Sequence, residues 1–179
     1  KEYRRQRQMC IRDSLKGAKM TGVDISDVAI HTATLHAKKE GLEIEYLNCE
    51  AEDLLPEEKE SFDLVTCLEA IEHVPDPAKL VETCSNLCKP GGTIVFSTIN
   101  RNPKSFLFAI VGAEYILNLL PKGTHEYKKF IKPSELSSMM RNNSLEVVEV
   151  IGMSYNPITK NYWLGKDVDV NYLIHAKKK

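Results

Sequence analysis

Several features that mark common protein classes are missing from this sequence of 179 residues. Its five cysteines form no paired C-x-x-C motifs, which argues against a disulfide framework or a zinc ribbon and favours a reducing compartment. The chain has no large excess of positive or negative charge, because it contains 24 Lys and Arg residues and 25 Asp and Glu residues. Nucleic-acid binders generally need a basic face, so we do not expect a nucleic acid as a partner.

A hydrophobic run long enough to cross a bilayer is also missing. The segment closest to one, residues 106–120 (FLFAIVGAEYILNLL), carries a single charge at Glu114. As a helix it would span about 22 Å, against roughly 30 Å of bilayer hydrocarbon. Its basic flanks Arg101, Lys104 and Lys122 are typical of an apolar helix in the bilayer interface, and packing as a core or lid helix is the alternative.

The first fourteen residues differ in character from the rest. They hold five basic and two acidic residues, and they lack the apolar stretch of a secretory signal. We interpret residues 1–14 as a solvated helix or a tail foreign to the domain, and residues 15–179 as the domain itself.

Strand and helix patterns alternate regularly from residue 15 onward. We expect strands at residues 19–24, 43–47, 62–68, 93–98, 145–153 and 170–176, and helices at residues 28–39, 77–88 and 133–142. Gly41 and the Pro90-Gly91-Gly92 turn stand where two of these helices end. The alternation predicts an α/β fold with a doubly wound sheet.

Acidic residues follow the first two predicted strands, and ligands of open α/β sheets bind at the carboxyl ends of strands. Asp24 could accept the hydroxyls of an adenosyl ribose, or it could cap the next helix. Glu50 and the small Ala51 could bracket an adenine, or they could belong to a solvated acidic loop.

A third cluster follows the strand predicted at residues 62–68. Glu69, Glu72 and His73 are spaced by three and four, so on a helical turn they would share one face. Two carboxylates and an imidazole could bind a hard divalent ion, and His73 could instead act as a general base. A capping and hydrogen-bonding role in the loop is the alternative.

Taken together, these motifs resemble those of a known family. The chain resembles the class I S-adenosylmethionine-dependent methyltransferases in G-V-D-I-S, F-D-L-V, E-H-V-P-D-P and K-P-G-G. It resembles the ubiquinone-biosynthesis O-methyltransferases, and their bacterial branch most, in S-T-I-N-R-N-P-K-S, P-K-G-T-H-E, K-K-F-I-K-P-S-E-L, Y-N-P-I-T and V-D-V-N-Y. The resemblance covers residues 15–179 and implies a Rossmann-like sheet with helices on both faces.

The resemblance also implies roles for single residues. Asp24 matches the ribose-binding acid, Leu68 matches a residue that lines the cofactor pocket, and Glu50 and Ala51 match the adenine side. Glu69, Glu72 and His73 match an E-x-x-E-H set that is associated with magnesium in the mitochondrial branch. Residues 104–126 correspond to an insertion that is implicated in membrane-lipid contact.

One family motif has no counterpart here. Family members carry a first strand and a glycine-rich D-x-G-C-G-x-G loop, which places the methionyl end of the cofactor at a helix N-terminus. Only Gly17 and Gly22 precede Asp24. We therefore expect an amino-terminally truncated chain that is inactive or impaired, with two strands left unpaired at their edges or forced to pair directly.

The implied activity is O-methylation of 2-polyprenyl-6-hydroxyphenol and 3-demethylubiquinol, with S-adenosylmethionine and possible Mg²⁺ as cofactors. His73 and His125 are the alternatives for the general base. We expect a cytoplasmic protein at a membrane surface contacted through residues 106–120, or one on the matrix side of the mitochondrial inner membrane if the source is eukaryotic. Other ubiquinone-biosynthesis proteins are expected partners. A non-catalytic scaffold subunit and a C-methyltransferase of the same pathway are the alternatives.

Overall fold

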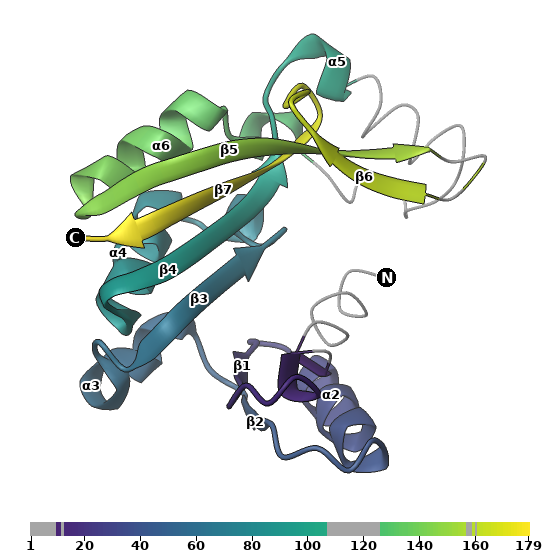
Figure 1. Ribbon diagram of the computed structural model, residues 1–179, viewed down its shortest axis with the longest axis vertical. Helices are drawn as coiled ribbons and strands as arrows, with labels where there is room; N and C mark the ends of the chain where they lie inside the picture. Colours follow the sequence, from purple (N-terminus) through teal and green to yellow (C-terminus); the bar gives the residue numbers. More distant parts are fainter. Residues whose placement is uncertain (1–9, 12, 107–125, 157–158, 160) are drawn as a thin grey trace. The chain divides into compact units, whose positions relative to one another are not determined.

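The computed structural model describes residues 10, 11, 13–106, 126–156, 159 and 161–179 (Figure 1). The chain divides into two compact units, residues 1–57 and 58–179, and each has its own sheet. We describe each unit by itself.

The first unit is built around a strand–helix–strand crossover. Strands β1 (Thr21–Val23) and β2 (Glu45–Leu47) pair in parallel, and helix α2 (Asp27–Lys39) connects them. Ser26 caps α2, because its hydroxyl accepts a hydrogen bond from the backbone N–H of Ala29. A short 3-10 helix, η1 (Ala51–Leu54), and helix α3 (Leu55–Glu58) follow β2.

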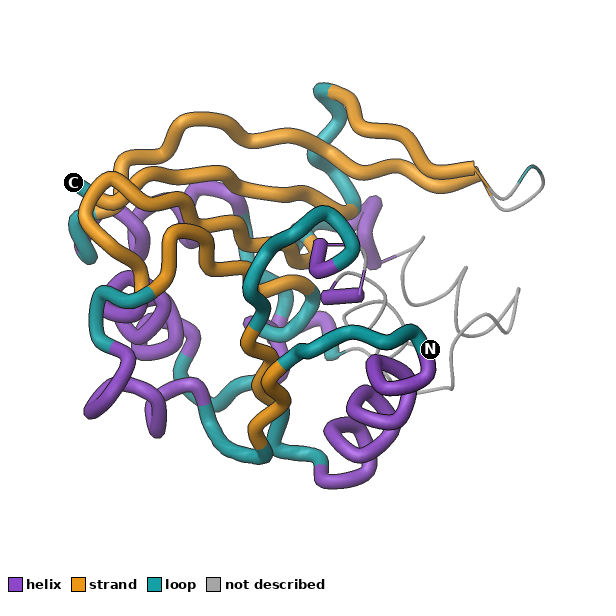
Figure 2. The backbone as a smooth tube through the Cα atoms, turned by 60° about the horizontal axis from the view of Figure 1, so that its bottom comes forward, coloured by secondary structure: helices purple, strands orange, loops and turns teal. Residues whose placement is uncertain are grey.

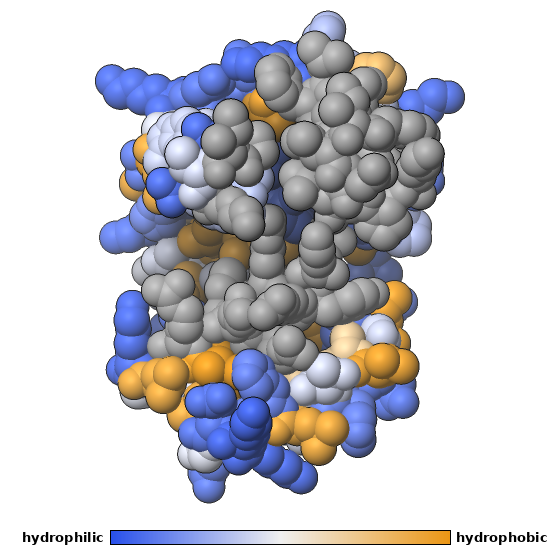
Figure 3. All heavy atoms as spheres, turned by 90° about the vertical axis from the view of Figure 1, so that its right-hand side faces the viewer, coloured by the Kyte–Doolittle hydropathy of each residue, from blue (hydrophilic) through white to orange (hydrophobic). Residues whose placement is uncertain are grey.

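Helix α2 buries small residues and exposes large ones. Ala33 and Ala37 are its buried residues, whereas Val28 and Leu35 stay exposed. Hydrophobic side chains also reach the surface on the molecular face shown in Figure 3. The core of this unit therefore rests on small contacts, and little apolar area is removed from water.

The second unit holds a five-stranded sheet in the order β3-β4-β7-β5-β6 (Figures 1 and 2). Its strands are β3 (Phe62–Leu68), β4 (Cys88–Ile99), β5 (Leu145–Asn156), β6 (Asn161–Gly165) and β7 (Asn171–Lys178). Strands β3 and β4 are parallel, and the β4–β7, β7–β5 and β5–β6 pairs are antiparallel.

Two helices cover one face of this sheet. Helix α4 (Pro77–Leu87) contacts β3 and β4, helix α6 (Pro133–Asn142) contacts β5 and β7, and the two helices contact each other. Three alternate residues of β7 are fully buried: Tyr172, Ile174 and Ala176. This alternation is what a half-covered strand requires. Shorter helical segments described in this unit are η2 (Ile71–His73), α5 (Pro103–Ser105) and η4 (Tyr127–Lys129).

The sequence of the Lys89–Gly92 segment predicts a sharp turn. The structure has this turn, but as a bulge within strand β4. Phe62 is opposite Cys88 and Leu64 is opposite Thr93, so four residues of β4 bulge out against Asp63 alone. Gly91 adopts a positive φ of 77°, a conformation that glycine tolerates best.

Strand β3 is the end strand of its sheet and, within the described residues, pairs with β4 alone. Among the helices of the described residues, none combines the length and hydrophobicity that crossing a bilayer requires.

Candidate functional site

The chain turns abruptly where β3 ends. Leu68 is the last residue of the strand, and Glu69 adopts a positive φ of 55°. The Glu69 N–H donates to the carbonyl of Ser97 at 3.0 Å, and the Ser97 hydroxyl donates to Glu69 Oε1 at 3.0 Å. Strand β4 therefore holds this turn through both backbone and side chain.

The next turn, η2, separates two neighbours that the sequence places together. Glu72 is buried, and its Oε2 accepts a hydrogen bond from the Thr98 hydroxyl at 2.7 Å. His73 is exposed. Glu69 lies outside the helical turn, because its φ is left-handed. The helical face on which the predicted metal site depended is therefore not formed.

The structure does not support the predicted magnesium site at Glu69, Glu72 and His73. Within the described residues, no three His, Cys, Asp or Glu side chains lie close enough together to hold a metal ion. Hydrogen bonds from Ser97 and Thr98 occupy the two carboxylates, so they serve the junction between β3 and β4.

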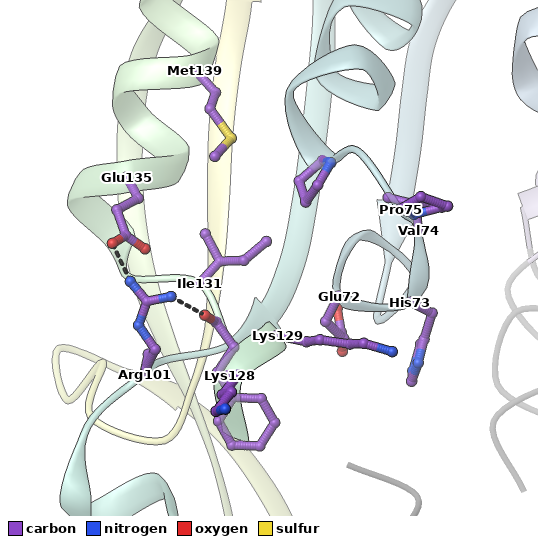
Figure 4. Close-up of a pocket in the computed structure, with 12 residues that line it drawn as sticks. Glu72, His73, Val74, Pro75, Arg101, Lys128, Lys129, Ile131, Glu135 and Met139 are labelled. Carbon is purple, nitrogen blue, oxygen red and sulfur yellow. Dashed lines mark hydrogen bonds and ion pairs between the residues drawn. The ribbon is translucent and has the colours of Figure 1, made fainter. Parts of the chain in front are cut away.

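A pocket of about 760 Å³ opens beside η2, at the carboxyl ends of β3 and β4 (Figure 4). It is lined by Glu72, His73, Val74, Pro75, Pro77, Arg101, Lys128, Lys129, Phe130, Ile131, Glu135 and Met139. Its volume falls in the range of small-molecule sites, and its place is the one that open α/β sheets use for ligands.

The apolar wall of the pocket is fixed to the sheet. The Ile131 N–H donates to the carbonyl of Ile99 at 3.1 Å, and the buried Tyr172 hydroxyl donates to the Ile131 carbonyl at 2.8 Å. Arg101 bridges the Phe130 carbonyl and the Glu135 carboxylate (Figure 4). Burial raises the pKa of Tyr172, and the negative charges of Glu72 and Glu135 add to this shift.

The opposite side of the pocket carries charge. Lys128 and Lys129 are exposed, and Lys129 Nζ lies 3.1 Å from a carboxylate oxygen of Glu126. Figure 4 shows the Lys129 side chain extending across the pocket toward Glu72 and His73. The pocket thus combines an apolar wall with cations and an imidazole, which suits an apolar ring that bears an ionisable oxygen.

Asp24 closes strand β1 in the first unit. Its N–H donates to the Leu47 carbonyl, and its own carbonyl accepts from Asn48 Nδ2 at 2.9 Å. Its Oδ1 accepts the Ser26 N–H at 2.8 Å, and within the described residues its Oδ2 receives no hydrogen bond. The alternative role as helix cap is wrong, because Ser26 caps α2. The carboxylate is thus held at the end of β1, and its role toward a ribose stays a prediction.

Glu50 and Ala51 lie at the start of η1. The Glu50 N–H donates to Asp53 Oδ2 at 3.0 Å, and its side chain is exposed, whereas Ala51 is half-buried. The predicted acidic loop after β2 is therefore a capped 3-10 turn.

Comparison with known proteins shows what this chain is related to. The methyltransferase domain family matches residues 8–96. A ubiquinone biosynthesis O-methyltransferase of Marinobacter nauticus is 57% identical over 166 residues, which are 92% of this chain and 70% of that protein. One of Saccharophagus degradans is 54% identical, over 95% of this chain and 72% of that protein.

This chain belongs to the ubiquinone biosynthesis O-methyltransferase family. Solved structures agree with the fold of this O-methyltransferase. A SAM-dependent methyltransferase of Thermotoga maritima, described as a possible histamine N-methyltransferase, superposes with a TM-score of 0.63 at 26% identity, over 89% of this chain and 73% of that one. One from Methanosarcina mazei has a TM-score of 0.67 at 22% identity, over 94% and 85%. The predicted Rossmann-like methyltransferase fold is confirmed.

Part of the predicted site lies outside the described residues of this O-methyltransferase. His125 and most of the insertion at residues 104–126 fall there, and Lys104, Ser105, Phe106 and Glu126 are the described part of that insertion. Sequence reasoning gave no role to Lys128, Lys129 or the Arg101–Glu135 pair. The K-K-F-I-K run was the available signal, because two adjacent cations precede a buried apolar pair there.

Proposed function

We propose that this chain transfers a methyl group from S-adenosylmethionine to a hydroxyl oxygen of polyprenylated phenols in ubiquinone biosynthesis. The proposed acceptors are 2-polyprenyl-6-hydroxyphenol and 3-demethylubiquinol. The pocket at the carboxyl ends of β3 and β4 carries the proposal, because it offers an apolar wall to the ring and ionisable groups to the oxygen. The names of the relatives support the pathway.

The proposed cofactor residues keep the roles that the resemblance implies. Asp24 accepts the ribose hydroxyls through Oδ2, Glu50 and Ala51 contact the adenine, and Leu68 lines the cofactor pocket. The rigid backbone of Asp24, tied at both its N–H and its carbonyl, supports a fixed ribose acceptor. S-adenosylmethionine supplies the methyl group, and the protein orients the acceptor oxygen for in-line attack.

The acceptor hydroxyl must lose a proton as its oxygen attacks. His73 is exposed and lines the pocket, and histidine is the most frequent general base in enzymes, so it is our first choice as the base. The Lys129 ammonium reaches across the same pocket and would stabilise negative charge on the oxygen. His125 is the alternative base.

Replacing His73 tests this assignment. His73→Gln should lower kcat by about 10²–10⁴ while S-adenosylmethionine affinity, measured by calorimetry, stays the same. His31→Gln is the matched control, because His31 is an exposed histidine of α2. An unchanged kcat in His73→Gln would remove His73 from the role of base and leave His125.

The insertion is proposed to hold the prenylated acceptor at the membrane. Phe106, its described aromatic residue, is 44% exposed and stacks edge-to-face on Tyr127 at 5.5 Å. Phe106→Asp should weaken co-sedimentation of the chain with vesicles. Equal binding of the variant and the unsubstituted chain would contradict the interfacial role.

A further inference from the structure

The far ends of β5 and β6 form a ribbon of two strands. Strand β6 pairs with β5 alone, and the ribbon extends beyond the rest of its sheet in both views (Figures 1 and 2). Neither α4 nor α6 contacts β6 at more than one or two positions. Three successive residues of β6 are accordingly more than half exposed: Tyr162, Trp163 and Leu164.

The two faces of the ribbon carry different side chains. Tyr162 is directly opposite Tyr155, and Leu164 is opposite Met153, so these four apolar side chains share one face, which we call the apolar ribbon face. The two tyrosine rings lie 4.4 Å apart between centroids. The other face pairs Asn161 with Asn156 and Trp163 with Ser154.

The ribbon is fastened to the start of the insertion. Lys104 Nζ contacts Asp167 and Asp169, both at 2.9 Å, in the loop directly after β6. Asn102 Nδ2 donates to the Asp169 carbonyl at 2.6 Å, and Asn100 Nδ2 donates to the Val168 carbonyl at 2.9 Å. These contacts join the base of the ribbon to the chain that leads to Phe106.

The chemistry of the apolar ribbon face favours a lipid surface over a second copy of the chain. Its four side chains are far fewer than the roughly 20–30 residues per partner of a standard protein interface. Tyrosine, which supplies two of these side chains, is enriched where membranes meet water, because its ring is apolar and its tip is polar. Lys166 is exposed next to the end of β6, where it can meet anionic headgroups.

We propose that the apolar ribbon face, together with the adjoining Lys166, is a membrane-contact surface that docks the enzyme on an anionic lipid bilayer. This inference rests on the proposed function, because a polyprenylated acceptor resides in a bilayer. The apolar ribbon face would be a second membrane contact in addition to Phe106. It comes from a different part of the sequence, and Lys104, two residues before Phe106, contacts the loop at the base of the ribbon.

Vesicle co-sedimentation tests the proposal with the purified chain. The vesicles contain phosphatidylcholine and phosphatidylglycerol. The double variant Tyr162→Asp/Leu164→Asp should lower the fraction bound by about tenfold or more, because two charges enter the apolar face.

Asn161→Asp is the matched control, since it adds a charge to the same strand on the opposite face and should change binding by less than about twofold.

Four outcomes overturn the proposal: no vesicle binding by the unsubstituted chain, equal binding by all variants, equal losses in both variants, or a dimer in sedimentation velocity that the double variant abolishes. Circular dichroism and thermal melting establish that the variants fold. Methylation of a short-chain, water-soluble catechol by the unsubstituted chain tests the proposed function separately, because that reaction needs no bilayer.

Discussion

Glu72 and His73 are adjacent residues with opposite environments, and this pair shows how far residue spacing can mislead. Spacings of three and four predict a shared face only on a regular helix. The backbone reverses at Glu69 with a positive φ, and a 3-10 turn then buries Glu72 against Thr98 while exposing His73. That His73 lies near a pocket could be predicted, because the residue follows a strand of the sheet. That Glu69 and Glu72 do not share a face with it could not be predicted from their spacing.

The buried Glu72–Thr98 hydrogen bond should contribute measurably to stability. Thr98→Val keeps the side-chain shape but removes the donor to a buried carboxylate, which should cost about 1–3 kcal/mol in the free energy of unfolding. Thr66→Val is the control on neighbouring β3, where the side chain is exposed and about 0.5 kcal/mol or less is expected. Urea unfolding measures both variants, and equal midpoints for the two would contradict the role of Thr98.

Tyr172 should make stability depend on alkaline pH. Burial raises its pKa, so the folded chain keeps the phenol neutral while the unfolded chain ionises near pH 10, its reference value. The contribution of Tyr172 to the free energy of unfolding is therefore complete below about pH 10 and declines above it. Tyr172→Phe should lose about 1 kcal/mol at neutral pH, from the bond to Ile131, and should show a smaller alkaline decline. Unfolding curves with the same pH dependence in both proteins would contradict this account.

At the scale of elements, regular hydrophobic patterns in the sequence were sufficient to predict most strands of the five-stranded sheet. The strands predicted at residues 62–68 and 170–176 match β3 and β7 closely, because each has a clear apolar pattern. Strand β6 escaped prediction because both of its faces are exposed, so N-Y-W-L-G lacks the alternation that marks a half-buried strand. The same exposure is what makes the ribbon a candidate for lipid contact.

The close approach of β5 to the loop after β6 depends on a glycine. A Cβ at position 152 would collide with the backbone carbonyl of Asp167, whereas at position 165 the nearest atom, on Trp163, would be 3.9 Å away. Gly152→Ala should therefore destabilise the chain by about 1–3 kcal/mol and loosen the loop that Lys104 holds. Gly165→Ala is the control and should stay within about 1 kcal/mol of the unsubstituted chain. Similar thermal midpoints for the two variants would contradict the steric argument.

At the scale of the whole molecule, the two units have unequal cores. Ile11, Ala33 and Ala37 are the buried hydrophobic residues described in the first unit, while the second buries several large side chains around α4, α6 and β7. A two-stranded sheet is only marginally stable in water, and apolar burial is the main favourable term in folding. The family fold was predictable from strand–helix alternation, but the division into two sheets depends on pairing that no local pattern encodes.

Hydrogen exchange should reveal this inequality. Backbone amides of β1 and β2 should exchange faster than those of β4 and β7, because local opening requires less apolar surface to be exposed in the first unit. Mass spectrometry of peptides from each strand measures the difference. Equal protection in the two sheets would show that the units unfold together.

The atom that receives the methyl group distinguishes the proposed O-methylation from methylation of a ring carbon. The decisive measurement incubates the purified chain with methyl-deuterated S-adenosylmethionine and a short-chain prenyl catechol, and locates the label by mass spectrometry. The position of the label decides, whatever the rate of turnover. We predict that the deuterated methyl group is found on a phenolic oxygen. Label on a ring carbon, or no transfer by a chain that binds both compounds, would contradict the account.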